Sequence, residues 1–313
     1  MNHRFGSVLA AVLLASCASS AAHAAMMYEP FDYNTGNLGL NTNSNGQTWY
    51  SSATSGTDDR VQVTSGSLTA PAGLPPSVGN ATTFGGAGRT DRIGMNLGNI
   101  NSGQVYYSLL LKVSDLTGTT AGGATVFGFN NTLQTAANHD TATQPSTISG
   151  RLIIRPLASS PSSRYEIGIH KSAGTTGEFQ FAPGDFGLSD TVFLVGRYTF
   201  NTVSGTDDTF DLWVNPSSAT FGDDSLIPLP TKTESAGGDT NTIATLILRQ
   251  TNLIVPAAMQ IDEIRADTTW ARVTSNQVVE VPEPGALALV CVCGMALVRR
   301  RTFWNPTRSS RFG

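Results

Sequence analysis

The feature that most constrains the fold is a run of alternating side chains over residues 104–113. A strand of this length with one fully apolar face is typical of a large sheet. No segment of residues 25–281, which we call the body, shows a helical period over ten residues or more. This favours an all-β sandwich or barrel. The apolar face carries Val105, Tyr107, Leu109, Leu111 and Val113.

Further strand patterns recur about every dozen residues and are separated by glycine-rich turns, as in all-β domains. Residues 71–80 contain three prolines, so we expect a loop there rather than a central strand. The other predicted strands are Arg60–Thr64, Thr125–Phe129, Leu152–Ile154, Arg164–His170, Thr191–Phe200, Phe210–Val214, Thr245–Arg249 and Met259–Ala266.

Charged residues make up only 13% of the 313-residue chain, against about a quarter in a typical soluble protein. The surface must therefore be built mainly from Ser, Thr, Asn and Gly, which is typical of exported β proteins. Six of the 19 basic residues but only one of the 23 acidic residues lie outside residues 25–281, which leaves 13 basic and 22 acidic residues in the body. This negative balance argues against nucleic acid and anionic lipid as partners of the body.

Residues 1–24 have the pattern of a secretory signal peptide. Arg4 supplies the positive charge, and Val8–Leu14 form the apolar region. The small residues that predict the cleavage site are Ala22, Ala24 and Ala25.

The three cysteines, Cys17, Cys291 and Cys293, all lie in the end segments. The body therefore has neither an internal disulfide nor a thiolate metal site, and it is large enough to be stable without them. Residues 14–17 also resemble a lipobox, so an alternative is that Cys17 is acylated and becomes the first mature residue.

The C-terminal region has three consecutive parts: a proline-flanked glutamate, an uncharged stretch over residues 285–298, and a basic cluster. As a helix the uncharged stretch would span about 21 Å, which is short of the roughly 30 Å hydrocarbon core of a bilayer. On these residues alone it is a short single-pass anchor with a cytoplasmic basic flank. The flanking residues are Pro282, Glu283, Pro284, Arg299, Arg300 and Arg301.

This tripartite order resembles the PEP-CTERM sorting signal of Gram-negative bacteria, over roughly the last thirty residues. The apolar stretch is shorter than usual, and residues 302–313 follow the arginines. The resemblance implies an exosortase-type membrane protease as the partner, which would cut at or near Pro282–Pro284. It also implies export, transient anchoring in the membrane by a single transmembrane helix, and release to the cell surface or the extracellular space.

The body resembles concanavalin A-like and laminin-G-like jelly rolls in four short segments. The resemblance implies that the first and last strands pair, so that the ends of the domain lie close together. We therefore expect a jelly-roll β-sandwich over residues 25–275, a linker over 276–281 and the sorting segment over 282–313. The four segments are Glu29–Tyr33, Arg197–Phe200, Phe210–Pro216 and Ile261–Arg265.

Two loops repeat the pattern Ser-Gly-Thr-Asp-Asp, over residues 55–59 and 204–208. Glycine and aspartate at these positions are typical of turns. An alternative is that Asp207 and Asp208 contribute to a calcium site, although the spacing is not that of an EF-hand.

Trp213 is a candidate sugar platform, and the alternative is that it packs in the core. The residues around Glu263 invite comparison with jelly-roll glycosidases, but their spacing does not match the paired carboxylates that hydrolysis needs. His139 and His170 are isolated in the sequence, as surface or strand residues often are.

From these observations we expect an exported cell-surface or extracellular-matrix protein whose body is structural and non-catalytic, with no cofactor. The alternative is a carbohydrate-binding module, with exopolysaccharide as a partner and calcium as a candidate ligand. A more remote alternative is a glycoside hydrolase, which the fold also supports.

Overall fold

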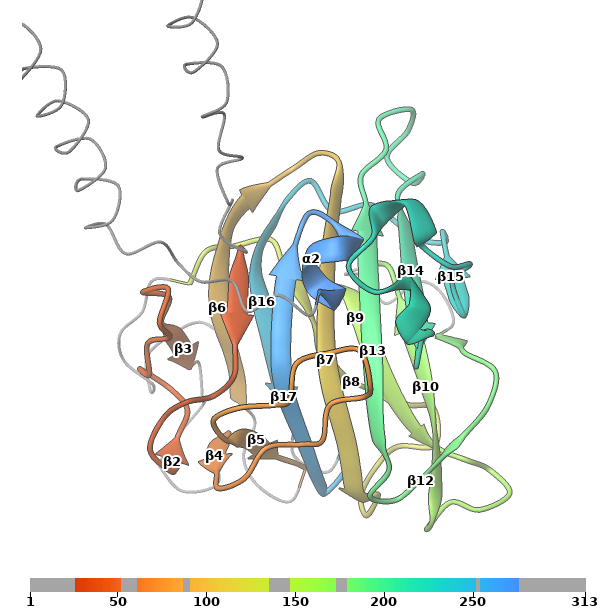
Figure 1. Ribbon diagram of the computed structural model, residues 1–313. Helices are drawn as coiled ribbons and strands as arrows, with labels where there is room; N and C mark the ends of the chain where they lie inside the picture. The colour runs from red at the N-terminus through yellow and green to blue at the C-terminus, as the bar shows by residue number, and fades with distance from the viewer. Residues whose placement is uncertain are drawn as a thin grey trace, which may run out of the picture. The chain divides into compact units, whose positions relative to one another are not determined.

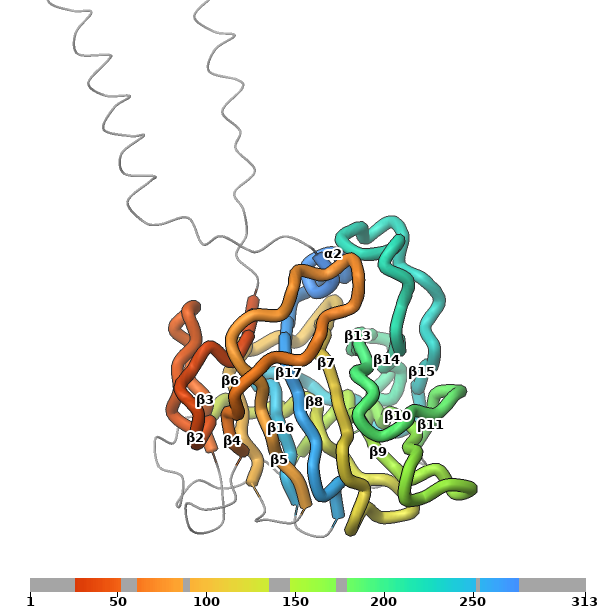
Figure 2. The backbone as a smooth tube through the Cα atoms, turned by 60° about the horizontal axis from the view of Figure 1, so that its bottom comes forward, coloured from red at the N-terminus to blue at the C-terminus, as the bar shows by residue number. Residues whose placement is uncertain are grey.

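The computed structural model describes residues 26–51, 61–86, 91–134, 147–172, 179–251 and 254–275. Two antiparallel sheets pack face to face, and within these ranges helix is limited to three short elements (Figures 1 and 2). The predicted all-β jelly-roll sandwich is therefore confirmed. The predicted signal peptide, the sorting segment and the loop over 55–59 lie outside the described residues. Within these residues, no helix is long and apolar enough to cross a membrane.

One sheet has nine strands, eight of them in the order β15-β14-β13-β7-β17-β5-β4-β2, with β1 also paired to β17. These strands are β1 (Met27–Glu29), β2 (Gly36–Asn37), β4 (Gln62–Thr64), β5 (Ala81–Phe84), β7 (Gln104–Asp115), β13 (Thr191–Thr199), β14 (Thr209–Val214), β15 (Lys232–Glu234) and β17 (Ala258–Asp267).

The other sheet has eight strands, seven of them in the order β11-β10-β9-β8-β16-β6-β3, with β12 paired to β10. These strands are β3 (Trp49–Ser51), β6 (Asp91–Ile100), β8 (Ala124–Asn130), β9 (Ile148–Pro156), β10 (Arg164–His170), β11 (Gln180–Phe181), β12 (Phe186–Gly187) and β16 (Ile243–Gln250).

The main core lies between the two sheets. The five apolar residues predicted on one face of β7 all belong to it, with exposed fractions of 0%. The ring of Tyr107 meets the rings of Phe127 and Phe129 on β8 edge-on, at centroid distances of 4.8 and 5.5 Å. Such contacts stabilise a core beyond the area that they bury. Alternation along β7 thus correctly predicted which face is inside.

A second apolar cluster covers the outer face of the nine-stranded sheet. The loop over residues 65–80 and helix α2 (Trp270–Thr274) lie in front of β7, β13 and β17 in Figure 1. Trp213 is 1% exposed in this cluster, and its ring lies 5.1 Å from that of Trp270. Its Nε1 donates to the carbonyl oxygen of Pro228. The burial of this ring favours the alternative that Trp213 packs in a core, because a buried ring cannot stack on a sugar. The sugar platform stays a prediction that the geometry does not favour.

The last strand, β17, holds both the middle and the beginning of the chain. One edge pairs with β7, and the other pairs with β5 and then with β1. The change of partner occurs at Glu263, where φ is 52° and the register shifts as in a β-bulge. The Glu263 carboxylate accepts hydrogen bonds from Tyr28 Oη, Val78 N and Arg265 Nη2. This carboxylate fastens the first strand and a covering loop to the last strand.

A second buried carboxylate fixes the start of the domain. Glu29 Oε1 accepts from Phe31 N, and Oε2 accepts from Tyr33 Oη and Trp49 Nε1, at distances of 2.6–2.8 Å. Burial raises the pKa of Glu29 to about 7, although the three donors oppose this shift. The first and last strands thus pair as the jelly-roll resemblance implies.

Candidate functional site

The outer face of the eight-stranded sheet carries arginines. Ile93 on β6 and Leu248 on β16 pair with each other and point into the core. Because side chains alternate along a strand, their neighbours Arg92 and Arg249 point outward. These two arginines are also directly opposite each other in the register. Like charges in this position repel, so the pair destabilises the sheet unless an anion lies nearby.

A third arginine joins them from β9. Leu152 belongs to the core, so the preceding Arg151 lies on the outer face, where it pairs with His170 on β10. Burial lowers the pKa of Arg249 to about 10, and the positive charges of Arg92 and Arg151 add to the shift. Arginine side chains in proteins stay cationic at neutral pH, so all three guanidinium groups are charged. We call Arg92, Arg151 and Arg249 the arginine cluster.

Between these residues, glycines leave the outer face of the eight-stranded sheet without projecting side chains of their own. Tyr50 on β3 and Ile247 on β16 both lie opposite Gly94 on β6. A Cβ at Gly94 would be 2.5 Å from Cδ1 of Ile247, so only glycine lets this side chain lie across the strand. The row continues to Gly128 on β8. In this row the Tyr50 ring is half-buried, whereas the Ile247 side chain is fully buried.

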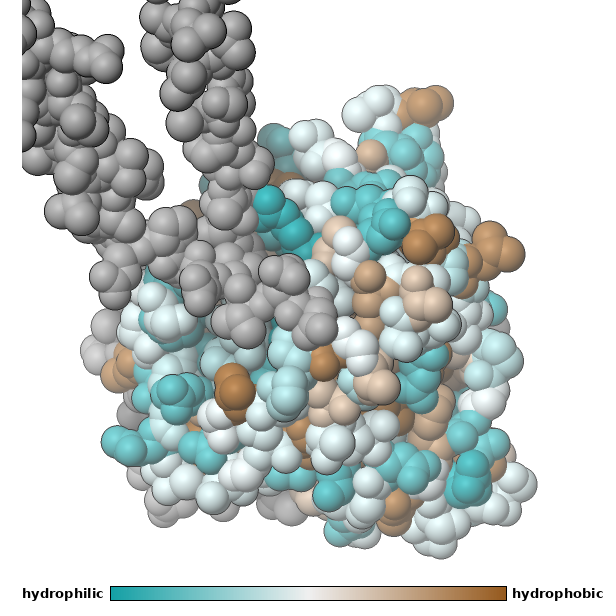
Figure 3. All heavy atoms as spheres, viewed as in Figure 1, coloured by the Kyte–Doolittle hydropathy of each residue, from teal (hydrophilic) through white to brown (hydrophobic). Residues whose placement is uncertain are grey.

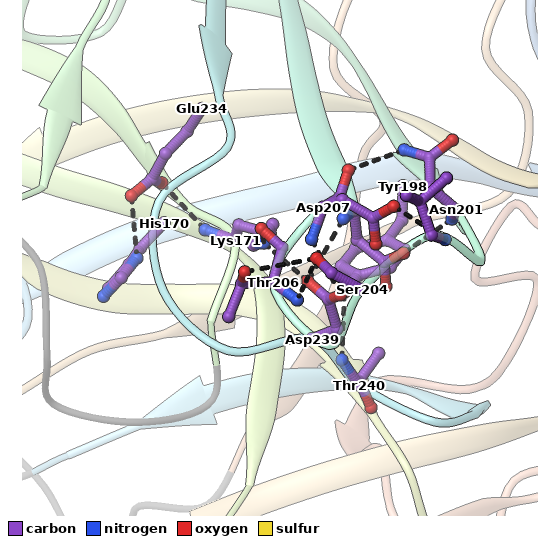
Figure 4. A network of polar contacts seen from close by, with 12 residues as sticks. His170, Lys171, Tyr198, Asn201, Ser204, Thr206, Asp207, Glu234, Asp239 and Thr240 are labelled. Carbon is purple, nitrogen blue, oxygen red and sulfur yellow. Dashed lines mark hydrogen bonds and ion pairs between the residues drawn. The ribbon is translucent and has the colours of Figure 1, made fainter.

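Beside the arginine cluster lies a buried histidine–carboxylate pair, shown in Figure 4. His170 Nδ1 is 3.1 Å from Oε1 of Glu234, which comes from β15 of the other sheet. The two side chains are 1% and 2% exposed. Oε2 of Glu234 accepts a hydrogen bond from the backbone of Lys171. This pair therefore connects the edges of the two sheets.

The second ring nitrogen of His170, Nε2, is buried and has no hydrogen-bond partner among the described residues. Nδ1 is at ion-pair distance from Glu234, although its geometry is not that of a hydrogen bond. A carboxylate near Nδ1 favours the tautomer with its proton on that nitrogen, which leaves Nε2 able to accept a proton. This arrangement suits general acid–base chemistry.

The predicted calcium residues lie close by, in the loop between β13 and β14. Oxygens of Asp207, Asp208 and Asp239 all lie within 4.8 Å of one another. The ammonium group of Lys171 already occupies this cluster: Nζ donates to Asp239 Oδ1 at 2.6 Å and to the carbonyl oxygen of Thr206 at 3.3 Å. Figure 4 shows the lysine between the loops. The protein thus supplies its own cation.

Few oxygens remain for a metal ion in this cluster. Both carboxylate oxygens of Asp239 and both of Asp208 accept hydrogen bonds from the protein. Oδ2 of Asp207 accepts from Val203 N, which leaves Oδ1 as the carboxylate oxygen without a partner. Calcium needs six to eight oxygen ligands. The calcium site stays a prediction, and the geometry of these residues does not favour it.

The carboxylates of β17 have a structural role in the described residues. Asp262 Oδ2 accepts from Leu68 N, and Oδ1 accepts from the backbone of Glu263. Burial raises the pKa of Asp262 to about 7. Asp262 holds the covering loop over residues 65–80 through Leu68, and Glu263 holds it through Val78. Because both carboxylates are used in this way, they do not form the paired acid and base of a glycosidase.

Sequence reasoning missed the arginine cluster and the histidine pair. The three arginines are separated by 59 and 98 positions, and the strand register alone brings them together. His170 is isolated in the sequence because its partner Glu234 belongs to the other sheet. The available signal was weak: Arg249 ends a predicted strand and Arg151 directly precedes one, but no strand was predicted around Arg92.

No protein-family model matches the chain, and no curated protein matches it. Solved structures do resemble it in fold. The alginate lyase Aly36B with a bound alginate trisaccharide is 12% identical, with a TM-score of 0.42, over 70% of this chain and 87% of that one. A domain of a GH43 extracellular arabinanase from Geobacillus stearothermophilus, in complex with arabinotriose, is 15% identical, with a TM-score of 0.42, over 82% and 100%.

An endo-β-1,4-glucuronan lyase from the fungus Trichoderma reesei is 11% identical, with a TM-score of 0.42, over 81% of this chain and all of that one. At such identities the likeness concerns the fold alone. It nevertheless corrects one expectation. The body was predicted to be structural and not an enzyme, whereas these proteins of similar fold are carbohydrate-active enzymes or domains of them.

Proposed function

We propose that this chain is an exported carbohydrate-active protein whose β-sandwich binds a polysaccharide along the outer face of the eight-stranded sheet. The single observation that carries this proposal is the difference between the two outer faces. The nine-stranded sheet buries its outer face under a second apolar cluster, whereas the eight-stranded sheet carries arginine, tyrosine and histidine side chains on its outer face.

The side chains of this face suit a sugar chain. Guanidinium groups are planar and donate several hydrogen bonds in a fixed geometry, as sugar hydroxyl and carboxylate oxygens require. Tyr50 offers a half-buried ring at one end of the row, beside Gly94. The strands run side by side for several residues, so an extended ligand can contact more than one of them.

The histidine pair supports turnover of the bound sugar. His170 lies next to Arg151 on the same face, with Glu234 behind it. A base must lie within hydrogen-bond reach of the proton that it removes. The ring is 1% exposed, so in this proposal the ligand must displace the groups that now cover it before Nε2 can move a proton at the sugar. Glu234 then orients the ring and compensates its charge.

The test is to incubate the purified protein with acidic and neutral polysaccharides and to measure binding, new reducing ends and the ultraviolet absorbance of unsaturated sugars. We expect binding and cleavage of one class, and loss of cleavage with retained binding in His170→Ala. A matched control is Arg164→Gln, in an exposed ion pair with Asp185. Failure of every polysaccharide to bind would refute the proposal.

The ends of the chain support an export route for this domain. We infer that residues 1–24 direct secretion and that an exosortase-type membrane protease recognises Pro282, Glu283 and Pro284, followed by the apolar stretch and Arg299–Arg301. The sandwich is then released to the surface or surroundings of a Gram-negative cell, where exopolysaccharide is the expected partner. What supports this is the tripartite order of the C-terminal sequence.

A further inference from the structure

We propose that the arginine cluster of Arg92, Arg151 and Arg249 is a binding site for an anionic group, and that the ligand of the domain is therefore an acidic polysaccharide. This inference rests on the proposed function and narrows it from sugar chains in general to those that carry carboxylate or sulfate groups.

The first observation is the grouping of positive charge. Arg92 and Arg249 are directly opposite each other on neighbouring strands, and Arg151 lies within electrostatic range of both. Folding brings these charges together although the body as a whole has more acidic than basic residues. Such a concentration of like charge is costly, and a bound anion would offset the cost.

The second observation concerns Arg249. Its Nε is buried and has no hydrogen-bond partner among the described residues. A buried donor without a partner costs free energy, so such groups are rare and call for an explanation. A ligand oxygen on this face would supply the missing acceptor.

The third observation is the contrast with other arginines of the domain. Several form an ion pair with a carboxylate on the same or a neighbouring strand or turn, as Arg155 does with Glu166 and Arg197 does with Asp211. Among the described residues, no carboxylate lies within ion-pair distance of Arg249. The fold thus neutralises arginines elsewhere and leaves this one available.

Glu234 does not fill the site, although its charge acts on Arg151. Its Oε2 accepts from Lys171 N, and its Oε1 lies 3.1 Å from His170. Glu234 is therefore held beside the histidine by its Oε2 hydrogen bond and by the proximity of Oε1 to the ring. Planar guanidinium groups such as that of Arg249 bind carboxylate or sulfate through two parallel hydrogen bonds.

Binding of the purified full-length protein to three polymers tests this inference: polygalacturonate (carboxylate), dextran sulfate (sulfate) and unmodified dextran (neutral). The variant is Arg249→Gln, and the matched control is Arg164→Gln. We expect the wild type to prefer at least one acidic polymer over dextran, and Arg249→Gln to lower that affinity tenfold or more. The control variant should bind as the wild type does.

The two acidic polymers distinguish the sources of the negative charge. Binding of polygalacturonate alone assigns a carboxylate, and binding of dextran sulfate alone assigns a sulfate ester. A salt titration of the wild type provides a second readout that needs no variant, and affinity should fall as salt screens the cluster. Arg249→Lys keeps the charge but loses the planar fork, so its affinity should lie between those of the wild type and Arg249→Gln.

Equal affinity for dextran and the acidic polymers, unchanged in Arg249→Gln and in high salt, would overturn this inference and leave the proposed polysaccharide binding intact. Absence of binding to any sugar polymer would overturn both. Thermal melting of each variant confirms that a loss of binding is not a loss of folding.

Discussion

Lys171 Nζ lies 2.6 Å from Oδ1 of Asp239, and the two side chains are 0% and 10% exposed. The bond ties the segment after β10 to the loop between β15 and β16, and so connects the edges of the two sheets. A buried ion pair of this kind helps to fix how the two sheets meet only while both partners are present, because removing one leaves an uncompensated buried charge.

Removing one partner should therefore be severe. Asp239→Asn leaves the Lys171 ammonium without its main counter-charge, and we expect a loss of roughly 3–5 kcal/mol in the free energy of unfolding. Denaturant unfolding measures this. The comparison is Asp185→Asn, which breaks the exposed pair with Arg164 and should cost less than about 1 kcal/mol. Equal losses in the two variants would show that Lys171 finds another partner.

The same lysine bears on calcium. Because its ammonium group occupies the cluster of Asp207, Asp208 and Asp239, we expect millimolar calcium to leave the melting temperature unchanged. A site filled at a hundredfold excess over Kd would add about 2.7 kcal/mol, which is several degrees for a domain of this size. Scanning calorimetry with calcium and with a chelator decides the matter. A shift that disappears in Asp207→Asn would establish a calcium site.

Trp213 should be a stability residue and not a ligand residue. Trp213→Ala would leave a cavity against Trp270 and Tyr106, and cavities of this kind cost about 3–5 kcal/mol. Leu229→Ala is the matched control, since Leu229 is 93% exposed. Chemical denaturation reports the difference. A folded, stable Trp213→Ala protein with weaker sugar binding would contradict the assignment to the second cluster.

Burial raises the pKa of Asp262 to about 7, well above the ordinary value near 4 that it regains on unfolding. Between these values the folded state binds more protons, so this group makes the free energy of unfolding fall as pH rises from about 4 to about 7. Replacement by Asn should therefore reduce the fall in the free energy of unfolding over this pH range by an amount on the order of 1–3 kcal/mol. Unfolding measured at pH 5 and pH 8 tests this, and an unchanged slope in Asp262→Asn would refute it.

The sorting segment gives a prediction in cells. Replacing Pro282, Glu283 and Pro284 by Ala should leave the full-length protein in the membrane, because the protease would no longer recognise it. Mass spectrometry of the released wild type should find its C-terminus near residue 284. Replacing Thr307 and Ser309 by Ala, beyond the arginines, is the control. Released wild-type protein that still carries Arg299–Arg301 would exclude the sorting mechanism.

The sequence predicted the fold well where alternation along a strand decides which face each side chain lies on. In β7 the inward residues alternate with the outward ones, and the alternation alone assigned Tyr107 and Leu109 to the core. The face of Trp213 was harder to assign. It points outward from β14, and that side becomes an interior only because a loop more than 130 residues earlier and helix α2, more than 50 residues later, cover it.

The candidate site could not be predicted in the same way. Arg92 meets Arg249 through strand pairing, and His170 meets Glu234 through the approach of two sheet edges. Neither contact can be predicted from the spacing of residues along the chain. The aspartates of the loop between β13 and β14 were visible, but the lysine that neutralises them was not, because Lys171 lies 36 and 37 positions before Asp207 and Asp208.

The position of β17 between β7 and the strands β5 and β1 has a consequence for the order in which the chain can mature. Met27 pairs with Ala266, so the first strand has no partner until nearly the whole domain has been synthesised. A chain that crosses a membrane pore with its N-terminus first thus cannot close its larger sheet on the way through. The native state of such a chain forms only after β17 has crossed the pore. The polypeptide therefore stays unfolded during translocation.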